Sequence, residues 1–181
     1  MTIRRAQRKD INQIATLALD LYKFHSRIDK RYKLKPDAIC LRYIKKDLIK
    51  YFKKPKGKTI LVVEEDGKIV GYADFGVEKR PFNFWEKGAW IWAIHVDKKY
   101  RRRSIATALV REAAKILKNK GIKEIDLGYV LKNKESANFW KFLGVKILSV
   151  NGIINIKDIL KIKLTNKSRY IGNSRRLHLT K

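Results

Sequence analysis

The sequence predicts an α/β (α+β mixed) fold built on a central mixed sheet, and three observations lead to it. Apolar runs with strand periodicity and with helical periodicity alternate along the chain. Two strand-length runs flank the dipeptide Asp66-Gly67, which is the strongest short hairpin signal. Further on, the apolar run 89–96 leads through a basic turn directly into a helical pattern. A sheet with both antiparallel and parallel neighbours is therefore expected.

The predicted elements follow in chain order. A short strand at Thr2–Arg5 precedes a helix that opens at Asp10, because apolar residues from Ile11 to Phe24 recur at helical spacing. A second helix opens at Pro36. The remaining expected elements are strands at 59–64, 68–75 and 89–96, a helix at 104–119, a strand at 122–130, a helix at 134–143, and closing strands at 145–150 and 153–164. This order gives about six to seven strands.

Domain organisation follows from where periodicity stops. Residues 1–164 form one predicted domain, within the usual size range. Residues 165–181 lose the pattern and carry five basic residues and no acidic one, so a basic C-terminal tail is expected.

Composition bounds the environment and the partners. No apolar run is long enough for a membrane span, and the charged N-terminus does not resemble a secretory signal. The single cysteine, Cys40, excludes an internal disulfide and a thiolate-based zinc site, so a cytoplasmic location and no metal are expected. The net charge is +27. Such a surface attracts nucleic acid, ribosomes or anionic cofactors. The alternative is a lysine-rich and isoleucine-rich composition bias without a partner.

The segment with the most chemistry is the basic turn before the helix at 104–119. The first amides of a helix lack internal partners and lie at the positive end of its dipole. Backbone N–H groups of residues 102–107 would therefore converge on an anion such as a pyrophosphate. The alternative is a solvated basic turn in which Ser104 caps the helix.

Three segments in order resemble the GNAT superfamily of acetyl-CoA-dependent N-acetyltransferases. The run Arg101-Arg102-Arg103-Ser104-Ile105-Ala106 is similar to the family's acetyl-CoA loop, Arg/Gln-x-x-Gly-x-Gly/Ala. The run from Asn133 to Gly144 resembles its Asn-x-x-Ala-x-x-Phe-Tyr-x-x-x-Gly signature, and residues 61–72 match its central hairpin. The resemblance covers about residues 2–150 and implies a sheet flanked by helices on both faces.

The resemblance also implies which residues bind the cofactor. Two parallel strands would splay, so that the exposed backbone pairs with the pantetheine arm and holds the thioester carbonyl. The implied acetyl-CoA contacts are Ile94, His95, Val96, Arg101, Arg102, Arg103, Ser104, Ile105, Ala106, Thr107, Asn133, Phe139 and Trp140. Asn133 is also expected as a helix N-cap. Ser104 stands where the family has glycine, which lets the backbone approach phosphate closely.

The usual proton-handling positions of the family are apolar here. Trp140 replaces a tyrosine acid, Trp92 and Ala93 occupy the positions of an acid on the long strand, and Gly128 that of one on the next strand. The remaining catalytic candidates are His95, otherwise a packed residue, and Tyr129, otherwise a core residue. Asp74 and Glu78 are expected as exposed strand charges, with ordering of water or of an acceptor amine as the alternative.

The acceptor site in this family lies beneath the first two helices. The segment 25–32 resembles a His-x-x-x-Asp-Pro-Arg-Phe/Tyr stretch of one subgroup, so His25, Asp29 and Tyr32 are acceptor candidates, with a helix-end cap as the alternative. Further candidates, which would line an apolar acceptor pocket or pack under a loop, are Phe82, Phe84, Trp85, Trp90 and Trp92.

The expected function is direct transfer of acetyl from acetyl-CoA to a primary amine of an unidentified acceptor, by a monomer or homodimer. The alternatives are a catalytically silent CoA-binding module and a basic nucleic-acid-associated or ribosome-associated protein on the same fold. The positive charge argues against polyamines, aminoglycosides and basic histone-like tails as acceptors.

Overall fold

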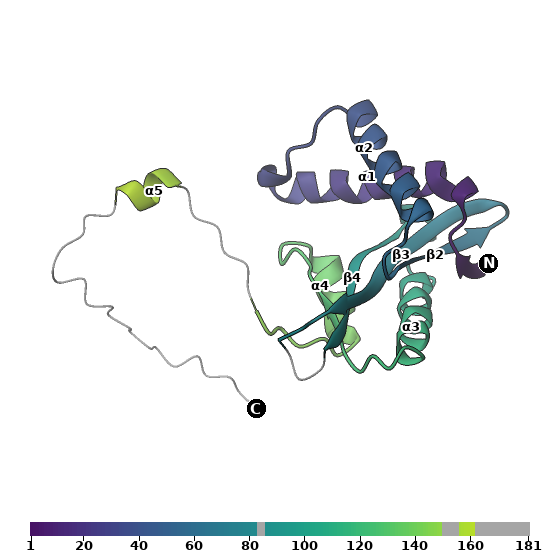
Figure 1. Cartoon of the computed structure of the whole chain (residues 1–181). Helices are drawn as coiled ribbons and strands as arrows, with labels where there is room; N and C mark the ends of the chain where they lie inside the picture. Colours follow the sequence, from purple (N-terminus) through teal and green to yellow (C-terminus); the bar gives the residue numbers. More distant parts are fainter. Residues whose placement is uncertain (83–85, 150–155, 162–181) are drawn as a thin grey trace. The chain divides into compact units, whose positions relative to one another are not determined.

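A mixed sheet organises the fold, as the sequence predicted (Figure 1). The computed structural model describes residues 1–82, 86–149 and 156–161. In the described part the sheet has five strands in the order β1-β2-β3-β4-β5. They are β1 (Thr2–Arg5), β2 (Lys58–Glu65), β3 (Lys68–Lys79), β4 (Lys87–Val96) and β5 (Ile125–Leu127). The first four are antiparallel neighbours, and β5 runs parallel to β4.

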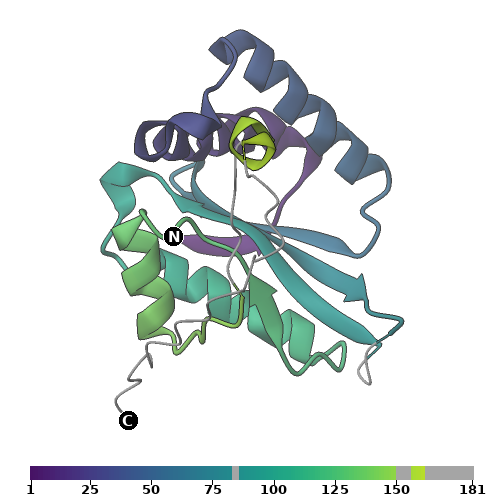
Figure 2. The ribbon, with the colours of Figure 1, turned by 90° about the vertical axis from the view of Figure 1, so that its left-hand side faces the viewer.

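Helices cover both faces of this sheet (Figure 2). On one face α1 (Ile11–Ile28) packs on β3 and β4, and α2 (Asp37–Lys53) packs on α1. The other face carries α3 (Ile105–Lys118), whose Ile105 lies against Gly71 of β3. The helix α4 (Lys134–Phe142) follows β5. Short 3-10 turns are η1 (Arg8–Asp10), η2 (Lys30–Tyr32) and η3 (Lys98–Tyr100).

The alternation of β-strand side chains places the main core between the sheet and the first two helices. Ile60, Val62 and Tyr72 point to this face from β2 and β3, where they meet the buried stripe Ile14, Ala15, Leu17 and Ala18 of α1 and Leu48 of α2. Burial of apolar surface is the main force that holds helices on a sheet. This core positions the α1 side of β3 and β4, where the candidate site lies.

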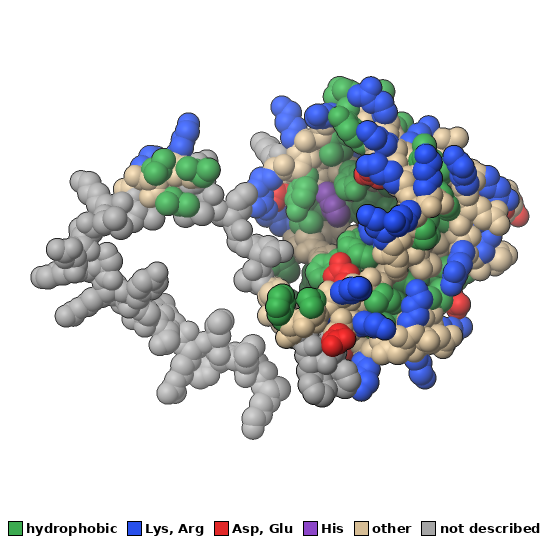
Figure 3. All heavy atoms as spheres, viewed as in Figure 1, with side chains coloured by type: hydrophobic (Ala, Val, Ile, Leu, Met, Phe, Trp, Pro, Cys, Tyr) green, Lys and Arg blue, Asp and Glu red, His purple; other side chains and the backbone are tan. Residues whose placement is uncertain are grey.

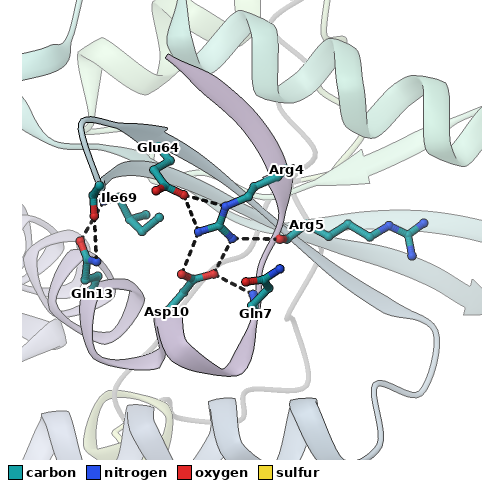
Figure 4. Close-up of polar contacts among 8 residues, drawn as sticks. Arg4, Arg5, Gln7, Asp10, Gln13, Glu64 and Ile69 are labelled. Atoms are coloured by element: carbon teal, nitrogen blue, oxygen red, sulfur yellow. Dashed lines mark hydrogen bonds and ion pairs between the residues drawn. The ribbon is translucent and has the colours of Figure 1, made fainter.

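A charged network fixes the N-terminal strand to the rest of the domain (Figure 4). Arg4 donates to both carboxylate oxygens of Asp10, at 2.7 and 2.9 Å, and its Nε donates to Glu64 at 2.7 Å. Asp10 also accepts from the backbone N–H of Gln7, at 2.7 Å. Nearby, Gln13 accepts from the N–H of Ile69 at 2.8 Å, which ties α1 to the β2–β3 hairpin.

The C-terminal elements differ from the prediction. The expected strand at 122–130 is shortened to β5, residues 145–149 are not a strand, and Ile156–Leu160 form a short helix, α5, instead of part of a strand. The sheet therefore has five described strands, below the six to seven expected. Ile156, Ile159 and Leu160 follow helical spacing, which the prediction overlooked. Residues 150–155 and 162–181, which include the expected tail, lie outside the described part.

The chain divides into two units, Met1–Gly144 and Val145–Lys181, and of the second only residues 145–149 and 156–161 are described. All five strands and the first four α-helices belong to the first unit, and α5 belongs to the second. No helix in the described ranges is long and apolar enough to cross a membrane.

Candidate active site

The strand β4 separates from β5 halfway along its length. It pairs with β5 only from Ala89 to Ile91. At the next residue, Trp92, an extra residue interrupts the pairing with β3, because Ile91 pairs with Phe75 and Ala93 with Asp74. Such a bulge bends a strand and increases its twist. Past this point β4 continues to Val96 without a bridge to any described residue on the β5 side.

This separation leaves backbone groups of β4 facing an open edge. The N–H of Asp97 donates to the carbonyl of Val70 on β3, at 2.9 Å. Because backbone groups alternate in direction along a strand, those of Ile94 and Val96 point to the opposite edge. The carbonyl of Val96 accepts from Arg101 Nε at 3.1 Å on that side. An extended ligand can therefore pair with Ile94 as an added strand would.

The basic turn at the start of α3 is shaped for an anion. Ser104 has φ 57° and Arg102 has φ 64°, both in the left-handed region. The N–H groups of Arg102, Arg103 and Ser104 donate to no acceptor in the described chain, and those of Ile105, Ala106 and Thr107 start the helix. Ser104 thus adopts the backbone conformation that favours glycine, and its side chain makes no cap hydrogen bond. Serine in place of the motif glycine therefore leaves the N–H groups of residues 102–107 arranged for an anion. We call this group of amides the anion cradle.

The three arginines of this turn have different positions. Arg101 is directed away from the cradle, because its guanidinium binds the Val96 carbonyl and the Glu135 carboxylate, the latter at 2.8 Å. Arg103 lies 3.7 Å from Glu65 and is exposed. Arg102 is exposed and makes no ion pair in the described ranges. Arg102 and Arg103 are therefore the arginines available to a bound anion, and Arg101 positions the turn.

Asp74 on β3 is the carboxylate that faces the α1 side next to the bulge. Its neighbour on β4 is Ala93. Its Oδ1 is buried and accepts no hydrogen bond from the described residues. Burial raises the pKa of Asp74 to about 6, and the charge of Lys58 opposes this rise. The expectation of an exposed strand charge is wrong for Asp74, because α1 packs over this part of the sheet.

The charge of Asp74 acts on two tyrosines, of which Tyr72 is buried and Tyr22 is half exposed. Tyr72 lies two residues earlier on the same face and is fully buried, and burial raises the pKa of its hydroxyl. Tyr22 lies on α1, and burial likewise raises its pKa, with contributions from the charges of Asp47 and Asp74. Both hydroxyls are therefore neutral at physiological pH and can donate a hydrogen bond.

His95 is buried opposite Tyr72 in the β3–β4 register. It is 8% exposed, and desolvation, followed by the charge of Arg101, lowers its pKa to about 4. The imidazole is thus neutral at pH 7, as expected of a packed residue. His25 on α1 is half-buried, and burial lowers its pKa too. A histidine side chain is visible in a hollow between apolar side chains on the face shown in Figure 3.

Of the three acceptor candidates at 25–32, two have neighbouring rings and the third, Asp29, lies at the end of α1. The His25 and Tyr32 rings lie together, with centroids 6.0 Å apart. Asp29 takes the helix-end role, since its side chain accepts from the Arg31 N–H at 3.1 Å and from the Arg31 guanidinium, which holds its pKa well below the usual range.

Of the two tryptophans of β4, Trp92 directly precedes Ala93, the strand neighbour of Asp74. Trp92 packs against Gly76, and the Lys58 ammonium lies 4.3 Å from the centre of its ring. Trp90 is half-buried near Gly128. Phe82 is 98% exposed and lines no pocket, contrary to expectation. Phe84 and Trp85 lie outside the described residues.

The residues of α4 occupy structural positions. Asn133 caps the helix by accepting from the N–H of Ser136 at 3.0 Å, as predicted. Trp140 is 4% exposed and meets Phe139 edge-on at 4.9 Å. Tyr129 is half-buried just beyond β5.

The structure brings the anion cradle, the open edge of β4 and the Asp74 environment to one end of β4. The sequence predicted the cradle from the helix start and the open edge from the family resemblance. It offered Asp74 only as an alternative for ordering water or an acceptor amine, and its burial was not expected. The sequence shows only that Asp74 alternates with Tyr72 inside the run 69–77, whose other residues are apolar or glycine, and it does not show what covers that face. Groups of three or more His, Cys, Asp or Glu suited to a metal do not occur in the described part of the chain.

Comparison with known proteins gives one family. The family model described as the acetyltransferase (GNAT) family matches residues 20–145. No curated protein matches the sequence. The solved structures with similar folds include the PaiA N-acetyltransferase of Thermoplasma acidophilum in complex with coenzyme A, at 21% identity and TM-score 0.69, over 83% of this chain and 92% of that one.

Two further solved structures have the same fold. A predicted acetyltransferase from Clostridium acetobutylicum, with acetyl-CoA, has 15% identity and TM-score 0.69, over 87% of this chain and 97% of that one. The ribosomal-protein-alanine N-acetyltransferase of Brucella melitensis biovar Abortus 2308 has 17% identity and TM-score 0.63, over 86% and 99%. At these identities the likeness shows the fold alone.

Proposed function

Because the chain belongs to the GNAT family of acetyltransferases, we propose that it transfers acetyl from acetyl-CoA directly to a primary amine, with no covalent enzyme intermediate. The observation that carries the proposal is the opening of β4 away from β5 beside a helix start with free amides. A thioester held there would lie close to Asp74, whose strand neighbour is Ala93.

The chain's own groups bind the donor in two places. The N–H groups of residues 102–107, with Arg102 and Arg103, hold the pyrophosphate at the start of α3. The free edge of β4 at Ile94 pairs with the pantetheine amides. Both surfaces belong to elements fixed by the core, which supports positioning of the two reactants as a main source of acceleration.

Asp74 is the proposed general base. As the amine nitrogen attacks, the N–C bond forms and the C–S bond breaks, and the Asp74 carboxylate accepts the proton that nitrogen loses. Tyr129, beyond the point where β5 leaves β4, is our candidate for donating a proton to the CoA thiolate. With a pKa of about 6, Asp74 is ionised at pH 7 and available as a base.

The same pKa favours an α-amine as the acceptor. An α-amine has a pKa of about 8, whereas a lysine ε-amine has a pKa of about 10.4, so a larger fraction of α-amine is neutral at pH 7. A carboxylate of pKa about 6 is too weak a base to compensate for a strongly protonated amine. Lys58 beside Trp92 and the net charge of +27 further disfavour polycations. We therefore propose a free amino acid or a peptide N-terminus as acceptor.

A catalytically silent CoA-binding module is the second candidate. It is favoured by one observation: Trp140, at the position of the family's tyrosine acid, is 4% exposed and has no acidic proton to give.

An acceptor panel separates the two candidates. The protein is mixed with acetyl-CoA and with peptides that have free α-amines, the same peptides with blocked α-amines and a free lysine, single amino acids, or spermidine. Thiol release and the mass gain of one acetyl group are measured. We expect transfer to free α-amines and little to lysine or spermidine. Binding of acetyl-CoA without transfer to any amine would support the silent module.

A further inference from the structure

The outward face of α2 carries basic residues from Arg42 to Lys53, the last residue of the helix. Residues 33–58, which contain α2, hold ten basic and two acidic residues. Arg42, Lys46 and Lys53 recur at spacings of four and seven, which places them on one side of the helix. Figure 3 shows Lys and Arg side chains gathered over α2 with apolar groups between them.

These charges are not neutralised by neighbouring acids. Of the two acidic residues, Asp37 pairs with Lys23 of α1, and Asp47 lies 3.8 Å from Lys50. No acidic group in the described ranges pairs with Arg42, Lys45, Lys46 or Lys53. Uncompensated charge on one helix face is the footprint expected of a surface that binds phosphates.

The same face has a shallow groove and an exposed ring. The groove, of about 770 Å³, is lined by Ala38, Leu41, Arg42, Lys45, Lys46, Ile49, Lys50 and Lys53. Tyr43 lies at its edge, 51% exposed, and Lys35 and Arg42 each lie 5.7 Å from the centre of its ring. Basic side chains around an exposed aromatic ring can bind phosphates and stack one unpaired base.

We propose that this surface, the α2 face (Arg42, Tyr43, Lys45, Lys46, Lys50 and Lys53), binds single-stranded RNA. The distance along the helix from Arg42 to Lys53 is about 16 Å, which spans about five phosphates at stacked spacing. The role is separate from acetyl transfer, because no residue of the α2 face belongs to the donor cradle or to the surroundings of Asp74.

The structure argues against a membrane as the occupant. A helix that lies in a membrane interface buries its apolar face in the lipid. The apolar side of α2 is already used, since Leu48, Ile44 and Leu41 pack in the core with α1. What remains outward is a row of five cations with the small apolar patch of Ala38 and Ile49 between them and the Tyr43 ring beside them, which suits a polyanion with exposed bases.

The test uses two variants with equal charge. The first replaces Arg42, Lys46 and Lys53 by Gln, and the control replaces Arg111, Lys118 and Lys120, all exposed residues on or just after α3, by Gln. Binding of a labelled oligoadenylate of about 12 nucleotides is titrated at several salt concentrations. We expect the α2 variant to lose at least about tenfold in affinity and its log–log salt slope to flatten by about two units. The control should match the unmodified protein.

A second variant tests the aromatic contact. Tyr43→Leu should weaken single-stranded binding by about tenfold and leave binding of duplex RNA unchanged. Equal losses in the two triple variants, or no measurable binding to RNA in the unmodified protein at physiological salt, would overturn the proposal. So would a loss at α2 seen with vesicles of anionic phospholipid and not with RNA.

Discussion

At the scale of single residues, Asp74 is a carboxylate in a buried environment that disfavours its charged form. Its pKa of about 6 lies above that of an unfolded aspartate, so folding takes up a proton between about pH 4 and pH 6. The contribution of Asp74 to stability is therefore present below this window and is lost as pH rises through it. Such a cost is common where a residue is kept for chemistry.

Replacing Asp74 by Asn should therefore stabilise the protein at pH 7. Asn keeps the shape and removes the buried charge, so the melting temperature should rise at pH 7 and match the unmodified protein near pH 4. The matched control is Asp47→Asn, an exposed carboxylate for which no such pH-dependent difference is expected. A lower melting temperature of Asp74→Asn at pH 7 would mean that the carboxylate has a stabilising partner.

Ser104 holds a left-handed backbone conformation at a position where the family motif has glycine. Its φ of 57° costs a side chain about 1 kcal/mol relative to glycine. Ser104→Gly should raise the free energy of unfolding by about that amount, measured by urea titration, and should keep the acetyl-CoA-induced thermal shift. Ser26→Gly, inside α1, should instead lower stability by about 0.5 kcal/mol. Equal losses in both variants would show that Ser104 has its own structural contact.

At the scale of elements, the start of α3 is the part most directly predicted from sequence. A strand followed by a basic turn and a helix predicts where the anion cradle lies, because the first amides of a helix have no partner inside the helix. The opening of β4 from β5 was implied only by the family resemblance, since no local pattern near Trp92 indicates a bulge. The burial of Asp74 could not be predicted, because it depends on how α1, which is distant in sequence, packs over β3.

Negative charge at the start of α3 should abolish donor binding. Arg103→Glu with Ala106→Glu places two carboxylates beside the amides that would hold pyrophosphate, so the rise in melting temperature with acetyl-CoA should disappear. Arg111→Glu with Ala114→Glu makes the same charge change eight residues further along α3 and should keep the rise. If both pairs of substitutions behave alike, net charge and not the cradle governs the thermal shift.

The closing strands expected at 145–150 and 153–164 show where sequence patterns mislead. A short apolar run fits a strand or a helix equally well by hydrophobicity, and only spacing separates them. Ile156, Ile159 and Leu160 have helical spacing and form α5. The strand β5 is also only three residues long, which gives a following strand little edge to pair with.

At the scale of the whole molecule, the N-terminal network holds the first strand and helix together. Asp10 is 2% exposed, and hydrogen bonding from Arg4 lowers its pKa. Its contribution to stability is present at neutral pH and is lost as pH falls through the lowered pKa.

Asp10→Asn should reduce the free energy of unfolding by about 2–3 kcal/mol at pH 7, because Arg4 loses a buried partner. Asp37→Asn, which breaks the exposed pair with Lys23, should cost less than about 0.5 kcal/mol. Chemical denaturation at pH 7 and pH 3 measures both, and the difference between the two variants should shrink at pH 3. A small loss for Asp10→Asn at pH 7 would mean that Glu64 alone holds Arg4.

The net charge of the protein can be counted from the sequence, but its distribution over the folded surface cannot. The +27 predicted a polyanion partner or a composition bias, and the tail at 165–181 was the expected place. The tail lies outside the described residues, and the described residues add α2 as a second place, because helical spacing brings Arg42, Lys46 and Lys53 to one face.

The central claim is that Asp74 accepts a proton during acetyl transfer at the open edge of β4. The measurement that tests it is the pH dependence of acetyl transfer to the best acceptor, compared between the unmodified protein and Asp74→Asn, with the acetyl-CoA dissociation constant measured alongside. We predict that the rate of the unmodified protein rises with pH through about 6, and that Asp74→Asn loses this limb and about 100-fold or more in kcat. Acetyl-CoA affinity should be unchanged. A variant that keeps both its kcat and the limb near pH 6 would contradict the account.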